Sequence, residues 1–192
     1  MPKLTRYWHG GAPGLRVGDV IRPSSTIGVR SATQLAAEFP DYDSDRVYVT
    51  NDKAHARAYA ANWRHPHPAS IEDIAARGDL YNVTPKGDRN DDPDYPTGVS
   101  WGCDKAIIVA VIERNVQPTL ATHLAGCKYT TWVGGGSMYA RDGHMLPSPE
   151  MTAMGITAAD LIPLGKGHPF GPDVTDYCLR ITEHRSQHQG DR

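Results

Sequence analysis

The stretch from Lys105 to Glu113, KAIIVAVIE, constrains the fold of this chain more than any other segment. Its Ile and Val side chains are branched at Cβ and nearly continuous, which favours a strand over a helix. A strand this apolar is typical of the centre of a sheet, where both faces are covered. We therefore expect a sheet built around residues 105–113.

Other strand patterns lie on both sides of this segment. Val47 and Val49 alternate with Tyr48 and Thr50, and this period of two is typical of a strand. Further strands are expected over residues 7–10, 80–85, 128–133 and 134–140, the last two joined by a turn at the triple glycine 134–136. The chain thus predicts about six to eight strands.

Helix signals are concentrated in the first half of the chain. The segment Asn51–Trp63 is alanine-rich; Asn51 or Thr50 is the expected cap, and Ala54, Ala58 and Ala61 share a face that allows close packing. Shorter helices are expected over residues 31–39 and 70–78, and after Ser148 and Thr157, where capping residues precede them. The sequence therefore predicts an α+β fold with a few short helices.

Length and charge limit the organisation and the partners. The chain has 192 residues, which fits one domain. We expect this domain over residues 1–181, followed by a polar, disordered tail over residues 182–192. The 20 basic and 22 acidic side chains give a formal net charge of −2, so a strongly cationic nucleic-acid binder is not indicated, although a local basic groove remains open.

The cysteines and the N-terminal segment indicate the cellular compartment of the protein. Cys103, Cys127 and Cys178 are too far apart in sequence for a CxxC pair, and their odd number fits a reducing compartment. The segment MPKLTRYWHGG has no apolar signal region, and no apolar run approaches the ~18 residues of a membrane-spanning helix. We expect a cytoplasmic protein without a membrane partner.

Common nucleotide and metal signatures are absent from the sequence. There is no GxxxxGK[ST] loop and no strand–GxGxxG–helix unit, and the triple glycine is interpreted as a turn. His65 and His67 lie in a proline-rich loop without completing ligands. His184 and His188 lie in the polar tail without the Glu of an HExxH motif. We interpret these histidines as surface residues and expect no metal.

Three local features carry chemical groups. His9 ends a short aromatic strand and is followed by Gly10, which lets a ligand approach the backbone. Tyr48 lies on the strand face opposite Val47 and Val49. Asp92 belongs to an acidic cluster, Asn90–Asp94, after the strand over residues 80–85. Each feature taken alone is at least equally compatible with an ordinary structural role: a buried His, a packed Tyr or a solvated acidic turn.

Taken in order, these features resemble the rifamycin-inactivating ADP-ribosyltransferases, within the superfamily that uses a His-Tyr-Asp/Glu triad. The similarity covers residues 6–116 and includes the flanking segments YWHG, LRVGDVI, VYVT with an alanine-rich helix, LYNVTPKG, DDPD and Ser100-Trp101 before the apolar strand. The resemblance implies an ADP-ribosyltransferase-like split β-sheet core. It implies a triad of His9, Tyr48 and Asp92, with Gly10 and Tyr59 as NAD-binding residues.

The residue types suit the reaction that the resemblance implies. Cleavage of the nicotinamide–ribose bond of NAD passes through an oxocarbenium-like transition state, which nearby negative charge stabilises. Asp92 would supply that charge while accepting a hydrogen bond from one ribose of NAD. His9 would bind the other ribose, and Tyr48 would stack on nicotinamide. This mechanism depends on positioning and electrostatics, so NAD is expected as co-substrate and no metal is required.

The acceptor of ADP-ribose stays open at this point. The rifamycin enzymes end soon after the apolar strand, whereas residues 117–192 follow here, and the loop 23–45 differs from theirs. The acceptor is therefore an unidentified small molecule or macromolecule. Two alternatives share the fold: an NAD glycohydrolase that uses water, and a non-catalytic binding domain. A virion or regulatory accessory protein without a small-molecule site is a further alternative.

Overall fold

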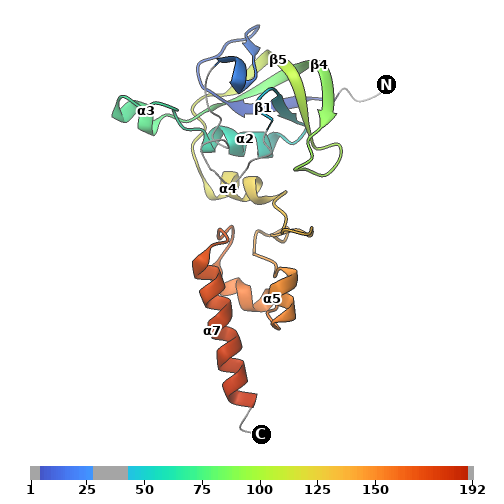
Figure 1. Ribbon diagram of the computed structural model, residues 1–192. Helices are drawn as coiled ribbons and strands as arrows, with labels where there is room; N and C mark the ends of the chain where they lie inside the picture. Colours follow the sequence, from blue (N-terminus) through green and yellow to red (C-terminus); the bar gives the residue numbers. More distant parts are fainter. Residues whose placement is uncertain (1–4, 28–42, 190–192) are drawn as a thin grey trace. The chain divides into compact units, whose positions relative to one another are not determined.

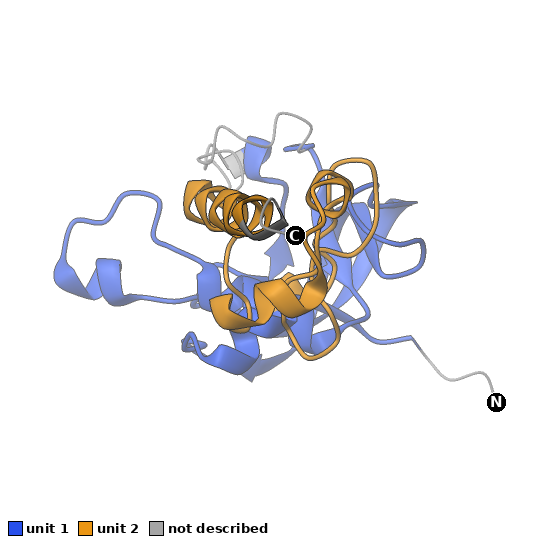
Figure 2. Ribbon diagram, turned by 90° about the horizontal axis from the view of Figure 1, so that it is seen from below, with its two compact units in different colours: residues 1–125 blue, residues 126–192 orange. Residues whose placement is uncertain are grey.

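The computed structural model describes residues 5–27 and 43–189 (Figure 1). The chain divides into two compact units, residues 1–125 and 126–192 (Figure 2). The sequence predicts a single domain over 1–181 with a family-like core over 6–116, whereas the structure gives the C-terminal region a compact unit and a hydrophobic core of its own. The helix expected over residues 31–39 lies outside the described residues.

Unit 1, residues 1–125, is built on an antiparallel sheet of five strands in the order β2-β5-β3-β1-β4. The expected mixture of α and β structure is confirmed. β4 also pairs with β5. The strands β5, β3, β1 and β4 therefore form a closed ring of pairings. The strands are β1 (Tyr7–Gly11), β2 (Val20–Ile21), β3 (Val47–Thr50), β4 (Asp79–Asp91) and β5 (Ser100–Glu113).

β5 occupies the centre of the pairing, because it bonds to β2, β3 and β4. Ala106 and Ile108 are buried, but Val109 and Ile112 are 49% and 39% exposed. The prediction that this strand is covered on both faces is therefore wrong. An antiparallel sheet can leave one face in water, and here the apolar run continues onto that open face.

The core of unit 1 is divided between two clusters. The larger cluster contains Ile21, Val47, Val49, Tyr81, Val83, Cys103, Ala106 and Ile108. A smaller cluster joins helix α2 (Lys53–Asn62) to the sheet and consists of Ala56, Ala60, Ala61, Leu80 and Val116, with Trp8 packed against it. The sheet thus has α2 on one side, beside β1 (Figure 1).

Helix α2 approaches β1 very closely because its contacting side chains are alanines. A Cβ added at Gly10 would lie 1.9 Å from the Ala56 carbonyl oxygen and 2.6 Å from the Ala60 nitrogen. Ala54, which was expected on the packing face, is exposed. Asp52, rather than Asn51 or Thr50, caps the helix: its carboxylate accepts hydrogen bonds from the backbone N–H groups of Ala54 and His55.

The remaining elements of unit 1 are short. The capping box of α3 (Ile71–Ala75), between Ser70 and Asp73, is confirmed. A 3-10 helix, η1 (Ser24–Ile27), follows β2, and α4 (Leu120–Cys127) crosses the boundary between the two units.

Asp79 is a buried carboxylate that the sequence pattern does not reveal. It accepts hydrogen bonds from the backbone N–H groups of Gly14 and Asn115, both at 2.8 Å, and from the Tyr81 hydroxyl and the Arg114 guanidinium. Burial raises its pKa, but these hydrogen bonds outweigh burial and hold it below the usual value. Asp79 therefore fixes the start of β4 to two loops.

Unit 2, residues 126–192, has its own core of eight buried side chains, and four helical segments lie wholly within its described residues, 126–189. The segments are α5 (Pro149–Ala153), α6 (Ala158–Leu161), η2 (Ile162–Leu164) and α7 (Pro172–Gln189). The core consists of Trp132, Tyr139, Met145, Met151, Ile156, Leu161, Val174 and Cys178. The predicted starts of α5 at Ser148 and of α6 at Thr157 are confirmed.

Two expectations for this region are corrected. The strands predicted over residues 128–140 are reduced to isolated bridges, such as Thr131 with Ser137 around the glycine turn. Residues 182–189, expected in a disordered tail, continue helix α7. Arg185 explains the longer helix, because its guanidinium bonds to the Asp160 carboxylate at 2.6 Å and to the Gly155 carbonyl at 2.8 Å.

Candidate active site around strand β3

His9 lies where two strands of the sheet separate. β1 pairs with β4 along its whole length, with His9 opposite Tyr81. Against β3, by contrast, β1 makes one residue pair, Trp8 with Thr50. Beyond that pair the His9 imidazole bonds to the carbonyl oxygen of Tyr48, with Nδ1 at 2.9 Å. At this seam, where β1 and β3 separate, the His9 side chain therefore donates to a β3 carbonyl in place of a backbone N–H.

The hydrogen bond to Tyr48 fixes the tautomer of His9. A carbonyl oxygen only accepts, so the Nδ1 atom must carry the proton and donate it. Burial lowers the pKa of His9 below its usual value, and this effect outweighs the bond to the Tyr48 carbonyl, which favours the protonated form. In the neutral ring, Nε2 is then an acceptor.

Gly11 leaves room for the Nε2 side of the His9 ring. A Cβ added at Gly11 would lie 2.4 Å from His9 Nε2, which is closer than any normal contact. The two residues share a face of β1 because side chains alternate along a strand. A glycine at position 11 is therefore required by the position of the catalytic candidate itself.

Tyr48 lies on β3 with its side chain half-buried. Its neighbours Val47 and Val49 are 3% and 1% exposed, which agrees with the expectation that Tyr48 occupies the opposite face. Across the sheet Tyr48 faces Gly102 of β5, and its ring is 3.7 Å from the position of a Cβ there. A Cβ at position 102 would be in ordinary van der Waals contact with the ring.

Asp92 directly follows β4 and is buried, whereas Asp91 is exposed. Its carboxylate accepts from the Ser100 hydroxyl at 2.9 Å and from the Asp94 backbone N–H at 3.1 Å. Burial raises the pKa of Asp92 above its usual value despite these two bonds. Of the two adjacent acids, the one chosen from the sequence is the one held in place.

His9 and Asp92 approach β3 from its two edges. His9 binds the carbonyl of Tyr48, and Ser100, the partner of Asp92, is 3.5 Å from the carbonyl of Val49. Successive carbonyls of a strand point to opposite edges, so these two contacts place His9 on the β1 side and Asp92 on the β5 side. His9 thus contacts the backbone of β3 directly, and Asp92 is linked to it through Ser100.

The two predicted NAD-binding residues have structural contacts as well. The glycine at position 10 is required by the backbone of α2, so packing alone explains it. Tyr59, on α2, is 49% exposed, and its hydroxyl bonds to that of Tyr95. Its role as an aromatic wall for NAD stays a prediction.

Two residues near Asp92 are not apparent from sequence patterns. The rings of His55 and Tyr95 contact each other edge to face and so join α2 to the turn after β4, which no local pattern predicts. For Tyr95 one weak signal exists: it follows Asp92 by three residues across a proline, the spacing of a turn.

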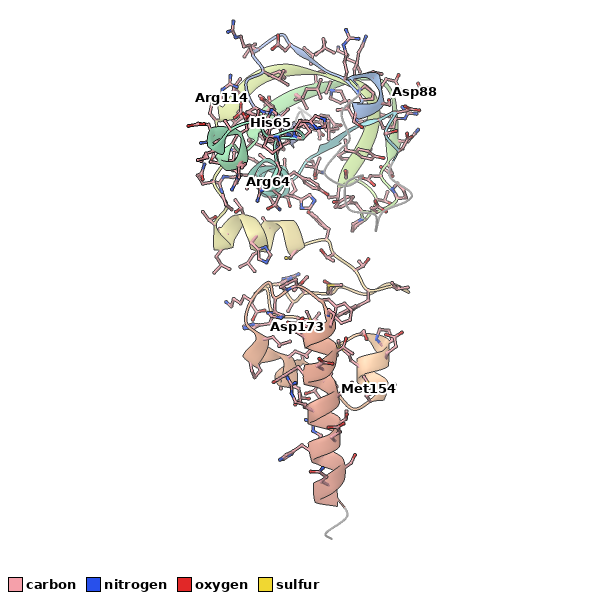
Figure 3. The ribbon with its side chains drawn as sticks, turned by 60° about the vertical axis from the view of Figure 1, so that its left-hand side comes forward. Arg64, His65, Asp88, Arg114, Met154 and Asp173 are labelled. Carbon is pink, nitrogen blue, oxygen red and sulfur yellow. The ribbon has the colours of Figure 1, made fainter. Side chains whose placement is uncertain are left out.

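The weaker histidine sites remain without a ligand set. His65, near Arg64 in Figure 3, accepts through Nδ1 from the backbone N–H of His67 and stacks edge-on against Trp63. Within residues 5–27 and 43–189, no group of three or more His, Cys, Asp or Glu side chains is arranged to hold a metal ion. His184 is exposed, as expected.

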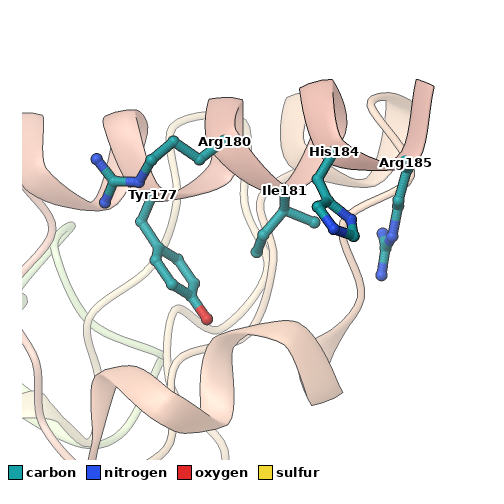
Figure 4. Close-up of a pocket in the computed structure, with 5 residues that line it drawn as sticks. All are labelled: Tyr177, Arg180, Ile181, His184 and Arg185. Carbon is teal, nitrogen blue, oxygen red and sulfur yellow. The ribbon is translucent and has the colours of Figure 1, made fainter. Parts of the chain in front are cut away.

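Unit 2 carries a pocket of about 430 Å³ along α7, which Figure 4 shows. It is open to solvent, and Tyr177 in its wall donates to the carbonyl of Asp160 at 3.0 Å. Its lining residues are Tyr177, Arg180, Ile181, His184 and Arg185. This lining contains none of the residues predicted from the sequence for NAD chemistry.

No protein-family model and no curated protein matches this chain. Among the described helices, none combines the length and apolar character required to cross a membrane.

Proposed function

We propose that this protein is an NAD-dependent mono-ADP-ribosyltransferase of the His-Tyr-Asp superfamily, with His9, Tyr48 and Asp92 as its triad. One observation supports the proposal: His9 bonds to the backbone carbonyl of Tyr48, and Ser100, which donates to the Asp92 carboxylate, lies 3.5 Å from the next carbonyl of β3, that of Val49. The acceptor is an unidentified small molecule or macromolecule, and the rifamycin-inactivating enzymes are the family that the chain resembles.

The seam between β1 and β3 supports the fold-level part of the proposal. The resemblance implies a split sheet, and a sheet whose strands separate after a single residue pair, with a histidine in the opening, fits that expectation. We therefore assign unit 1 to an ADP-ribosyltransferase-like fold. Unit 2 has no assigned role in the reaction.

The chemistry of the site fits a dinucleotide with two riboses. His9 Nε2 is an acceptor in the neutral ring and is suited to a ribose hydroxyl. Asp92 is a buried carboxylate whose charge acts in a partly water-free environment, where electrostatic stabilisation of a cationic transition state is strongest. Tyr48 supplies an aromatic ring for nicotinamide. These roles require positioning and charge rather than a covalent nucleophile.

The experiment that tests the proposal follows nicotinamide release. Purified protein is incubated with NAD alone and then with rifamycin, DNA, RNA or a protein lysate, and acceptors are searched for a mass increase by one ADP-ribose. Release with water alone would identify an NAD glycohydrolase. If no condition gives nicotinamide above a protein-free control, the proposed function is wrong.

The pH dependence of kcat/KM follows from the two shifted groups. Asp92 must be ionised, and its pKa lies above the usual 3.8; His9 must be neutral, and its pKa lies below the usual 6.5. Both requirements fail on acidification, so we expect kcat/KM to fall as the pH is lowered from neutral. Initial rates from about pH 4 to about pH 9 check this. Activity that rises as the pH falls below neutral would contradict the assignment.

A further inference from the structure

A cluster of three aromatic side chains lies behind Asp92. The Tyr95 ring contacts His55 edge to face, with ring centroids 5.2 Å apart, and the Tyr59 ring contacts the same histidine at 5.1 Å. The hydroxyls of Tyr59 and Tyr95 hydrogen-bond each other. His55 is itself buried and bonds through Nδ1 to the carbonyl of Ala125 at 3.0 Å.

Tyr95 closes the turn that presents Asp92. Its backbone N–H donates to the carbonyl of Asp92 at 3.1 Å, while the Asp94 N–H donates to the Asp92 carboxylate. Ser100 holds the carboxylate from the other side. The turn is thus attached to β5 through Ser100 and to α2 through the Tyr95 side chain.

Helix α2 contacts the segments that carry His9 and Asp92. At Ala56 and Ala60 its backbone lies directly against Gly10, the residue after His9. At Tyr59 it bonds to Tyr95 and hence to the turn of Asp92. One rigid helix therefore fixes the distance between the strand that carries His9 and the turn that carries Asp92.

We propose that Tyr95 is a positioning residue: through its hydroxyl bond to Tyr59 it docks the Asp92 turn onto α2 and orients the carboxylate toward the reacting ribose. This inference rests on the proposed function. The hydroxyl, rather than the ring, is the part that acts.

Tyr95→Phe removes that hydroxyl and keeps the ring on His55. We expect kcat for nicotinamide release to fall about tenfold, because a small displacement of a catalytic group has effects of this order, with KM for NAD changed less than about twofold. Tyr59→Phe should have the same effect, and the double variant should be no worse than either single variant. Circular dichroism at the assay temperature verifies folding.

Two controls separate positioning from a general structural effect. Tyr177→Phe, in unit 2, removes a hydroxyl bonded to the Asp160 carbonyl and should leave kcat unchanged. In an Asp92→Asn background, Tyr95→Phe should change the residual rate less than about twofold, since the group on which it acts is already altered.

The outcomes are distinguishable. If wild type turns over NAD and Tyr95→Phe has the same rate, this inference is wrong and the proposed function stands. The same conclusion follows if Tyr95→Phe lowers the rate a full tenfold in the Asp92→Asn background. A wild-type protein that releases no nicotinamide under any condition overturns the proposed function and this inference with it.

Discussion

Replacing Asp92 by Asn is expected to lower the rate of nicotinamide release about a hundredfold to a thousandfold, the loss typical of removing one preorganised electrostatic contact to a transition state. Asn has nearly the same shape, and its one amide oxygen can still accept from the Asp94 N–H or from Ser100, the two donors to the Asp92 carboxylate. The change therefore removes charge with little change in packing. Rates with saturating NAD, measured by chromatography of nicotinamide, check this expectation.

Asp91→Asn is the matched control, because Asp91 precedes Asp92 directly but is exposed. We expect its rate to stay within about twofold of wild type, since an exposed charge is screened by water. Equal losses in the two variants would mean that the general negative potential of the segment matters rather than the buried carboxylate. An undiminished rate in Asp92→Asn would remove Asp92 from the triad.

Replacing Gly10 by Ala is expected to destabilise the fold by about 3 kcal/mol, the upper range for forcing extra volume into a packed core. The added Cβ would lie 1.9 Å from the Ala56 carbonyl oxygen, so β1 and α2 must separate. Thermal unfolding followed by circular dichroism should show a midpoint lower by about 10 °C. An unchanged midpoint would show that α2 does not press on β1 as described.

Gly102→Ala, in β5, is the comparison for this variant. A Cβ there meets Arg46 at 3.4 Å and Tyr48 at 3.7 Å, which are ordinary contacts. We expect a stability change below about 1 kcal/mol. If Gly10→Ala loses activity, the measured stability will show how much of the loss comes from the displaced helix rather than from nicotinamide binding.

Features set by neighbouring residues were predictable from the sequence. The strand at Val47–Thr50, the capping box of Ser70 and the helix start at Ser148 depend on spacing within a few residues, and each is found. β4 extends to Asp91 through a polar segment, because its pairing with β5 sustains it there. No local pattern contains that information, and the same is true of the exposed face of β5.

For the candidate site, residue types and their order suggest His9, Tyr48 and Asp92 through the resemblance, and burial distinguishes Asp92 from Asp91 only once the fold is known. The bond from His9 goes to a backbone carbonyl, which every residue possesses, so the sequence gives no sign of it. Tyr95 reaches Tyr59 across the fold from another element.

The burial of Asp92 also has a consequence for the stability of the folded chain. Its pKa is raised on folding, so the folded state binds this proton more tightly than the unfolded state does. Stability contributed by this group is present below the unfolded pKa and is lost as the pH rises through the folded pKa. Above the folded pKa the ionised side chain therefore opposes folding, and the same charge is the one proposed for catalysis. Selection for stability alone would replace it.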